Sequence, residues 1–151
     1  MNPTLRAIAL IIIGIGVVTA FFWTGLTIRP KTTLGNGSVV VEKYNKVPPG
    51  FPDGLVPPGV PLRYAQIITQ GGQKTYAVAM NSTLSMPAQV SALQKALQDN
   101  GWEIKEQRIS ASGIIEAVKG GERLSATVTA GNNQSGLLVV VLTYIPLPTN
   151  K

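Results

Sequence analysis

The chain contains no cysteine and no histidine, and only seven of its 151 residues are acidic. Without cysteine it has no disulfide, no thiol nucleophile and no zinc–thiolate site. Without histidine it lacks the usual general base and the commonest metal ligand. The few carboxylates are spread along the sequence and form no tight set of oxygen ligands. We therefore expect no metal, no cofactor and no enzymatic activity.

Charge is also absent from one long apolar stretch. Ala7–Ile28 comprises 22 residues without a charged side chain. As a helix it would be roughly 33 Å long, enough to cross a hydrocarbon core of about 30 Å. Trp23 lies near its end, and Arg29 and Lys31 follow it, as is typical of residues at a membrane interface. We predict a transmembrane helix over residues 7–28.

Two other interpretations of this stretch were weighed. A cleavable signal peptide has a shorter apolar region and small residues before the cut. Val18-Thr19-Ala20 offers such a site, but the apolar run continues past it, and cleavage stays open. A pilin-like helix would need an early acidic residue, and no acid precedes Glu42.

Positive charge concentrates near this stretch. Of the net charge of +6, residues 1–46 contribute +4 and residues 47–151 only +2. Cationic residues beside a membrane span are expected at headgroup depth. A nearly neutral remainder is not typical of a nucleic-acid-binding domain. The expected partners are the lipid bilayer and other membrane or envelope proteins, with no nucleic acid.

Residues 29–61 are rich in proline and glycine, and the tetrapeptide VPPG occurs twice. Proline fixes φ and withholds a backbone donor, so we predict a linker rather than part of a sheet. It could serve as a semi-rigid spacer or as a polyproline ligand for a groove-binding partner. A third interpretation has Phe51, Leu55 and Val60 packing across the domain as a belt.

Residues 62–147 are predicted to form an α+β domain, followed by a tail at 148–151. Strands are expected at 63–70, 74–81, 102–109, 114–119, 123–130 and 137–145, with a helix between the second and third. Gly71-Gly72 and Gly120-Gly121 indicate hairpin turns. The order is β-β-α-β-β-β-β, one small antiparallel sheet with a helix on one face. The last strand is apolar on both faces, which is typical of a strand that is central or covered on both sides.

The helix is predicted from an apolar stripe, namely Met86, Val90, Leu93 and Leu97. Ser85 is expected to cap its N-terminus, and Gly101 to end it.

Few side chains suggest a reactive site. Ser85 with Lys119 is a weak candidate for serine–lysine catalysis, because Ser85 has a competing role as a cap. Glu103 and Glu106 form the densest acidic group, but we expect them on opposite faces of a strand. Trp102 is expected to fill the core rather than stack on a ligand.

The polar loop Asn132, Asn133 and Gln134 is the candidate interaction surface.

One resemblance rests on Phe51-Pro52, Pro57-Pro58-Gly59, and Leu97 followed by Gly101-Trp102. In this order, around a hairpin and a helix, these residues resemble small bacterial domains of unknown function that follow a membrane anchor or a lipoprotein signal. The resemblance covers roughly residues 50–145 and implies the architecture, with no activity to transfer. The lipoprotein form would need a cysteine.

These observations favour a single-pass, membrane-anchored protein with a small non-catalytic interaction domain. It would act as an accessory subunit of a membrane complex or as an envelope contact. The alternative is an extracytoplasmic module that binds a small ligand or a glycan.

The membrane orientation gives a first prediction. The leading tail, residues 1–6, is very short, so we place it in the cytoplasm and the domain outside. Protease added to intact spheroplasts should therefore digest the domain. A domain protected until the membrane is opened would contradict this orientation.

Overall fold

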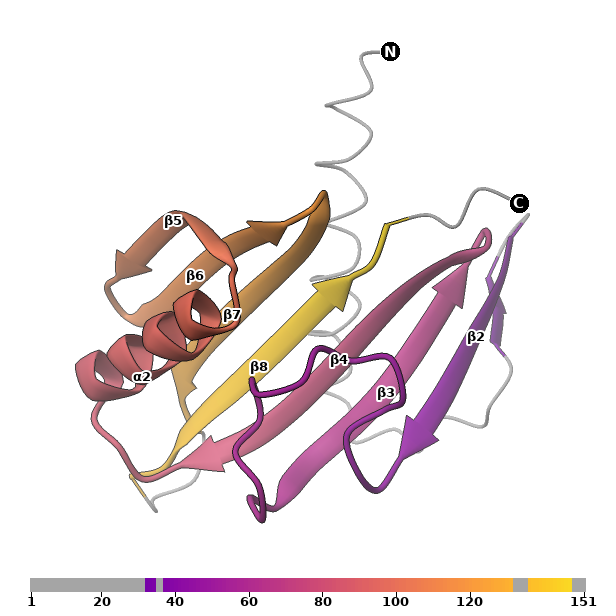
Figure 1. The fold of residues 1–151 in the computed structure, drawn as a ribbon. Coiled ribbons are helices and arrows are strands. Elements are labelled where there is room, and N and C mark those ends of the chain that lie inside the picture. The colour runs from indigo at the N-terminus through magenta and orange to yellow at the C-terminus, as the bar shows by residue number, and fades with distance from the viewer. Residues whose placement is uncertain (1–31, 35–36, 132–135, 148–151) are drawn as a thin grey trace.

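The computed structural model describes residues 32–34, 37–131 and 136–147, which form one antiparallel sheet of eight strands and one helix. The elements are β1 (Thr32–Leu34), β2 (Gly37–Tyr44), β3 (Leu62–Gln70), β4 (Gln73–Ser82), α2 (Met86–Asp99), β5 (Glu103–Ile109), β6 (Ser112–Lys119), β7 (Glu122–Ala130) and β8 (Leu138–Ile145). Across the sheet the order is β1-β2-β3-β4-β8-β7-β6-β5 (Figure 1).

The sheet consists of two meanders joined at its centre. Strands β1 to β4 pair in chain order, and so do β5 to β8. α2 carries the chain from β4 to the far edge, and the chain returns strand by strand until β8 pairs with β4. The prediction of a central last strand is confirmed.

Both glycine pairs make the expected hairpin turns. Gly71 and Gly72 have φ angles of 56° and 81° between β3 and β4, and Gly120 and Gly121 have 57° and 92° between β6 and β7. Positive φ at both central residues gives a turn whose twist matches that of the flanking strands. The two hairpins follow from these local preferences.

The helix forms where the apolar stripe predicts it. Val90, Leu93 and Leu97 are buried, and α2 contacts β5, β6 and β7. The helix ends at Asp99 with Asn100 as its C-cap, and Gly101, with a φ of 77°, turns the chain out of the helix as predicted. Lys119 Nζ donates to the carbonyl oxygen of Asn100 at 2.8 Å and satisfies a group at the helix end.

The expected role of Ser85 as a side-chain cap is wrong. Ser85 occupies the N-cap position with an extended backbone, but its side chain makes no capping hydrogen bond. Pro87 in the first turn has no backbone N–H, so the helix start has one donor fewer to satisfy.

The predicted linker over residues 29–61 is corrected by the structure. β2 lies inside this range and pairs with β3 over six residues, from Val39–Gln70 to Tyr44–Ala65. Three consecutive valines, residues 39–41, supply β-branched side chains that suit a pleated surface. The sheet therefore begins well before residue 62.

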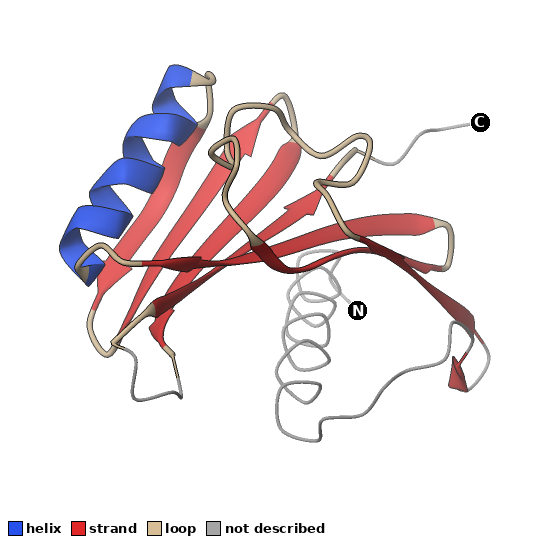
Figure 2. Cartoon of the chain, turned by 90° about the horizontal axis from the view of Figure 1, so that it is seen from below, coloured by secondary structure: helices blue, strands red, loops and turns tan. Residues whose placement is uncertain are grey.

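The proline-rich segment, residues 45–61, packs as a belt over the sheet. Phe51 and Leu55 are only 5% and 3% exposed, and Val60 contacts the same core. The belt and α2 lie on the same side of the sheet (Figure 2). Of the three interpretations, the belt is the one that agrees with this packing.

The predicted anchor lies outside the described residues. This applies to Ala7–Ile28, including Trp23, to the flanking Arg29 and Lys31, and to the tails at 1–6 and 148–151. Within the ranges that the structure describes, no helix is both long and apolar enough to span a bilayer.

A second prediction tests the belt. Phe51→Ala should lower the free energy of unfolding of the full chain by about 3–5 kcal/mol, because it empties a filled aromatic site. Val47→Ala, in the same segment but 36% exposed, should change it by less than about 0.5 kcal/mol. Denaturant unfolding of the full chain in detergent measures both. Equal, small effects would mean that the segment behaves as a spacer.

Candidate interaction surface

The sheet has two unlike faces. Side chains alternate between them along each strand, and register partners on adjacent strands point to the same side. We call the side under α2 and the belt the covered face, and the opposite side the open face. Among the described residues, no helix or loop lies over the open face (Figure 2).

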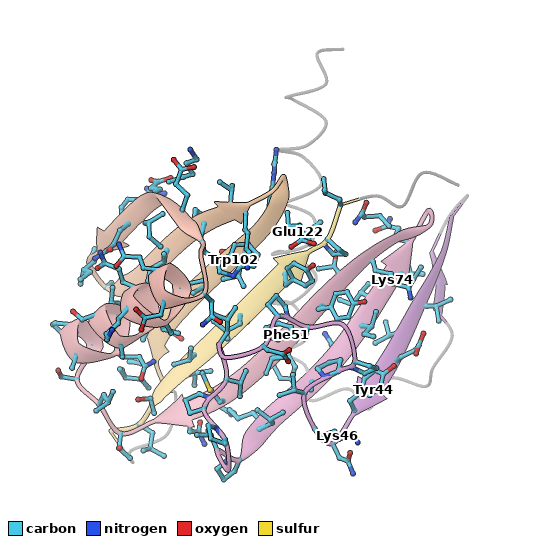
Figure 3. The ribbon with its side chains drawn as sticks, viewed as in Figure 1. Tyr44, Lys46, Phe51, Lys74, Trp102 and Glu122 are labelled. Atoms are coloured by element: carbon cyan, nitrogen blue, oxygen red, sulfur yellow. The ribbon has the colours of Figure 1, made fainter. Side chains whose placement is uncertain are left out.

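The covered face is filled by an aromatic cluster around Tyr144. The ring of Tyr144 lies 6.1 Å from that of Phe51, 5.5 Å from that of Tyr76 and 6.1 Å from that of Trp102, centroid to centroid. Phe51 and Trp102 meet it edge-on, at 79° and 88°. Phe51 comes from the belt and Trp102 follows α2 (Figure 3), so the cluster joins both covers to the sheet.

Polar contacts around the cluster are structural. The Tyr144 hydroxyl donates to Glu122 Oε1 at 2.8 Å. Burial, and then this bond to a carboxylate, raise the pKa of Tyr144 above its ordinary value. Trp102 is 4% exposed, which confirms it as a core residue.

The other residues singled out from the sequence do not converge. Ser85 precedes α2, whereas Lys119 contacts the opposite end of that helix, about 20 Å away along 14 residues. The expectation that Glu103 and Glu106 lie on opposite faces of a strand is wrong, because a bulge between Ile104 and Glu106 leaves Glu103 paired with Val118 and Glu106 with Glu116, on one face. Each is instead paired with a neighbouring cation: Glu103 with Lys105, and Glu106, whose Oε1 lies 2.7 Å from Arg108 Nε. In the part of the chain that the structure describes, no three acidic residues are grouped to hold a metal.

The predicted interaction loop lies outside the described residues. Asn132, Asn133 and Gln134 fall in the gap between 131 and 136, so that prediction stays untested.

The open face, by contrast, is apolar over its central strands. The apolar side chains come from β2, β3, β4 and β8, and they are Val39, Val41, Tyr64, Ile68, Ala77, Ala79, Val139, Val141 and Ile145. The centre of this set is buried, since Ala77 and Ala79 are 0% and Val139 is 6% exposed, so this is a face that packs against another surface and does not stand free in solvent. We take it as the candidate interaction surface.

Small and large residues lie side by side at the centre of this surface. On β4, Ala77 and Ala79 are 0% exposed. Their register partners on β8 are Thr143 and Val141. The strand of alanines forms a trough, and the adjacent strand of larger side chains forms a ridge.

Charged residues lie at the borders of the surface. Lys43 is exposed on β2 and points to the open face, as does Glu116 on β6. Glu116 is half-buried and accepts a hydrogen bond from Ser125 Oγ at 2.6 Å. Burial raises the pKa of the Glu116 carboxyl, and the nearby carboxylate of Glu106 adds to the increase, while the Ser125 bond opposes it.

No protein-family model, curated protein or solved structure matches this chain. The resemblance to small anchored bacterial domains therefore stays a prediction. Function has to be inferred from the geometry of the two faces.

The sequence analysis missed the open face. One signal for it was present, since the last strand is apolar on both of its faces. With the belt assigned to a linker, however, neither sheet face could be distinguished as covered or open.

A third prediction compares two adjacent valines of β8. Val140 is buried on the covered face, and Val141 is half-buried on the open face. Val140→Ala should lower the free energy of unfolding by about 2 kcal/mol or more, since it removes two packed methyl groups. Val141→Ala should cost less than about 1 kcal/mol in dilute protein. Urea unfolding in detergent compares them, and equal losses would show that both faces are packed within one chain.

Proposed function

We propose that this chain is a single-pass membrane protein that presents a small non-catalytic α+β domain outside the cytoplasm. The domain binds another membrane or envelope protein through the open face. The observation that carries the proposal is the apolar surface on β2, β3, β4 and β8, over which no described helix or loop lies. The uncharged stretch Ala7–Ile28 supports the anchor.

The chemistry of the open face favours a protein partner over a glycan. Glycan sites need aromatic platforms and polar groups that fix orientation. On the described open face, Tyr64 is the single aromatic residue, and its neighbours are aliphatic. The larger aromatic group lies in the core around Tyr144. An aliphatic sheet face is suited to another packed surface.

The anchor fixes which end of the domain lies near the bilayer. Ile28 and Thr32 are four residues apart, so at most about 13–14 Å of chain connects the predicted span to β1. Thr32 pairs with Val39, next to the β3–β4 turn. This end of the sheet is held close to the membrane surface.

The fourth prediction tests partner binding. A photo-cross-linking amino acid at Val141 of the full chain, expressed in its native membrane, should form an adduct with a protein. The same probe at Gln98, on the exposed surface of α2, is the control. Adducts from Val141 but not from Gln98 are expected. No adduct, or identical adducts from both sites, would reject the open face as the binding surface.

Membrane attachment is measured on the same preparation. Alkaline carbonate should leave the full chain in the membrane pellet, because a hydrophobic span resists extraction. Release into the supernatant would reject the anchor without bearing on the open face.

A further inference from the structure

We infer that the open face is covered, within the same chain, by the apolar segment Ala7–Ile28, and that insertion of this segment into a bilayer uncovers the face for its partner. The inference rests on the proposed function and adds the regulation of the same surface. It starts from the burial of side chains at the centre of the open face.

Two small residues of the open face differ in exposure. Ala77 on β4 and Ser125 on β7 each lie between register partners on two neighbouring strands, and both have Thr143 of β8 on one side. Ala77 is 0% exposed, whereas Ser125 is half-buried. Because both side chains are small and flanked alike, neighbours within the sheet do not account for the difference. A cover above β4 does.

The burial extends along the centre of the face. Ala79 is 0% and Val139 is 6% exposed, and the hydroxyl oxygen of Tyr64 is also buried. These residues come from the adjacent strands β4, β8 and β3. The described covers, α2 and the belt, both lie on the opposite side of the sheet (Figure 2). The cover of the open face therefore comes from outside the described residues.

Residues 1–31 include a stretch of the right size. The other stretches outside the described ranges, 35–36, 132–135 and 148–151, are too short to cover three strands. As a helix, Ala7–Ile28 is roughly 33 Å long and about 10–12 Å across. The ten residues of β4 extend over about 34 Å, and three adjacent strands span about 10 Å. The segment thus matches the buried area in length and in width.

The chemistry of the segment also suits this face. The segment is uncharged, and the charged residues Lys43 and Glu116 lie at the borders of the face, on β2 and β6. Five strand spacings separate these borders, which amounts to roughly 24 Å. A helix over β3, β4 and β8 therefore contacts neither charge. Removing both apolar surfaces from water stabilises the contact.

The connection to β1 allows this position. At most about 13–14 Å of chain joins Ile28 to Thr32. From β1, two strand spacings and one layer spacing of about 10 Å combine to about 14 Å. The end of the segment can therefore reach the open face over β3 while β1 stays paired with β2.

The bilayer offers the segment a second apolar environment. Ala7–Ile28 cannot lie in a hydrocarbon core and on the open face at once, because the face belongs to the domain outside the bilayer. Covering and insertion are therefore alternative states, and a bilayer shifts the population toward insertion. The partner site is occupied before insertion and vacant after it. The cover keeps an apolar surface out of water until the chain reaches its membrane.

The fifth prediction concerns the accessibility of a single thiol. Because the chain has no cysteine, Val141→Cys introduces one thiol, on the open face. In the full chain synthesised cell-free without lipid, N-ethylmaleimide should label it slowly. Phosphatidylcholine vesicles present during synthesis should accelerate the labelling about tenfold or more, since the uncovered state becomes the populated one. This reagent crosses bilayers, so it reaches the domain on either side.

Two positions away from the open face are the controls. Ser91→Cys, on the exposed side of α2, should react fast with and without vesicles. Val140→Cys, buried on the covered face, should react slowly in both, and circular dichroism verifies the fold. Labelling of Val141→Cys as fast as Ser91→Cys without vesicles would overturn the cover. Slow labelling with vesicles, in a chain that resists carbonate extraction, would overturn the uncovering.

A cross-link identifies what covers the face. In the lipid-free full chain, a short bismaleimide should join Val17→Cys to Val141→Cys within one molecule. It should not join Val17→Cys to Ser91→Cys, which lies beyond the other side of the sheet. Mass spectrometry distinguishes links within a monomer from links between chains. Links between chains alone would mean that a second copy covers the face, and would overturn the inference.

The inference and the proposed function can fail separately. If Val141→Cys reacts equally fast with and without vesicles, while the photo-probe at Val141 still joins the chain to a different protein in native membranes, the cover is wrong and the proposed function stands. If the photo-probe gives no adduct but vesicles accelerate the labelling, the partner is wrong and the cover stands.

Discussion

The pairing of β4 with β8 is the constraint on which the rest of the structure depends. It joins Tyr76 to Tyr144 and continues to Ser82 and Leu138, linking segments more than fifty residues apart. Without it there would be two separate four-stranded meanders, and β4 and β8 would each become an unpaired edge strand. The β4–β8 pairing places Tyr76 and Tyr144 side by side, and Phe51 and Trp102 pack against Tyr144 to complete the aromatic cluster. The trough and ridge of the open face are the reverse side of the same pair.

Features set by local preferences could be predicted from the sequence. The two glycine pairs require positive φ and mark their hairpins, and the apolar stripe of α2 marks the buried side of the helix. The apolar last strand correctly indicated a central position. These features need no knowledge of distant partners, because each is decided by a few neighbouring residues.

Features set by distant contacts could not be predicted. β2 is a strand because β3 offers it an edge, and its three valines lie among residues typical of turns. The belt has the composition of a spacer, and only its packing against the core side chains of β4 and β8 explains why Phe51 and Leu55 are buried. The candidate site illustrates the same limit. The sequence analysis chose the Asn132–Gln134 loop because it is polar. The candidate surface in the structure is instead the apolar open face, whose residues come from four strands that are distant in the sequence.

The central position of β8 also has a consequence for biosynthesis. The sheet cannot close until residue 145 has been made, because its middle strand is the last described strand in the chain. Domains generally fold as units during synthesis, and non-local pairings form late. A chain that still lacks β8 would contain β1–β4 and β5–β7 as two groups of strands that are not paired with each other, which is a loosely folded state. For the export proposed above, such a loosely folded chain would still be able to pass through a narrow translocation channel.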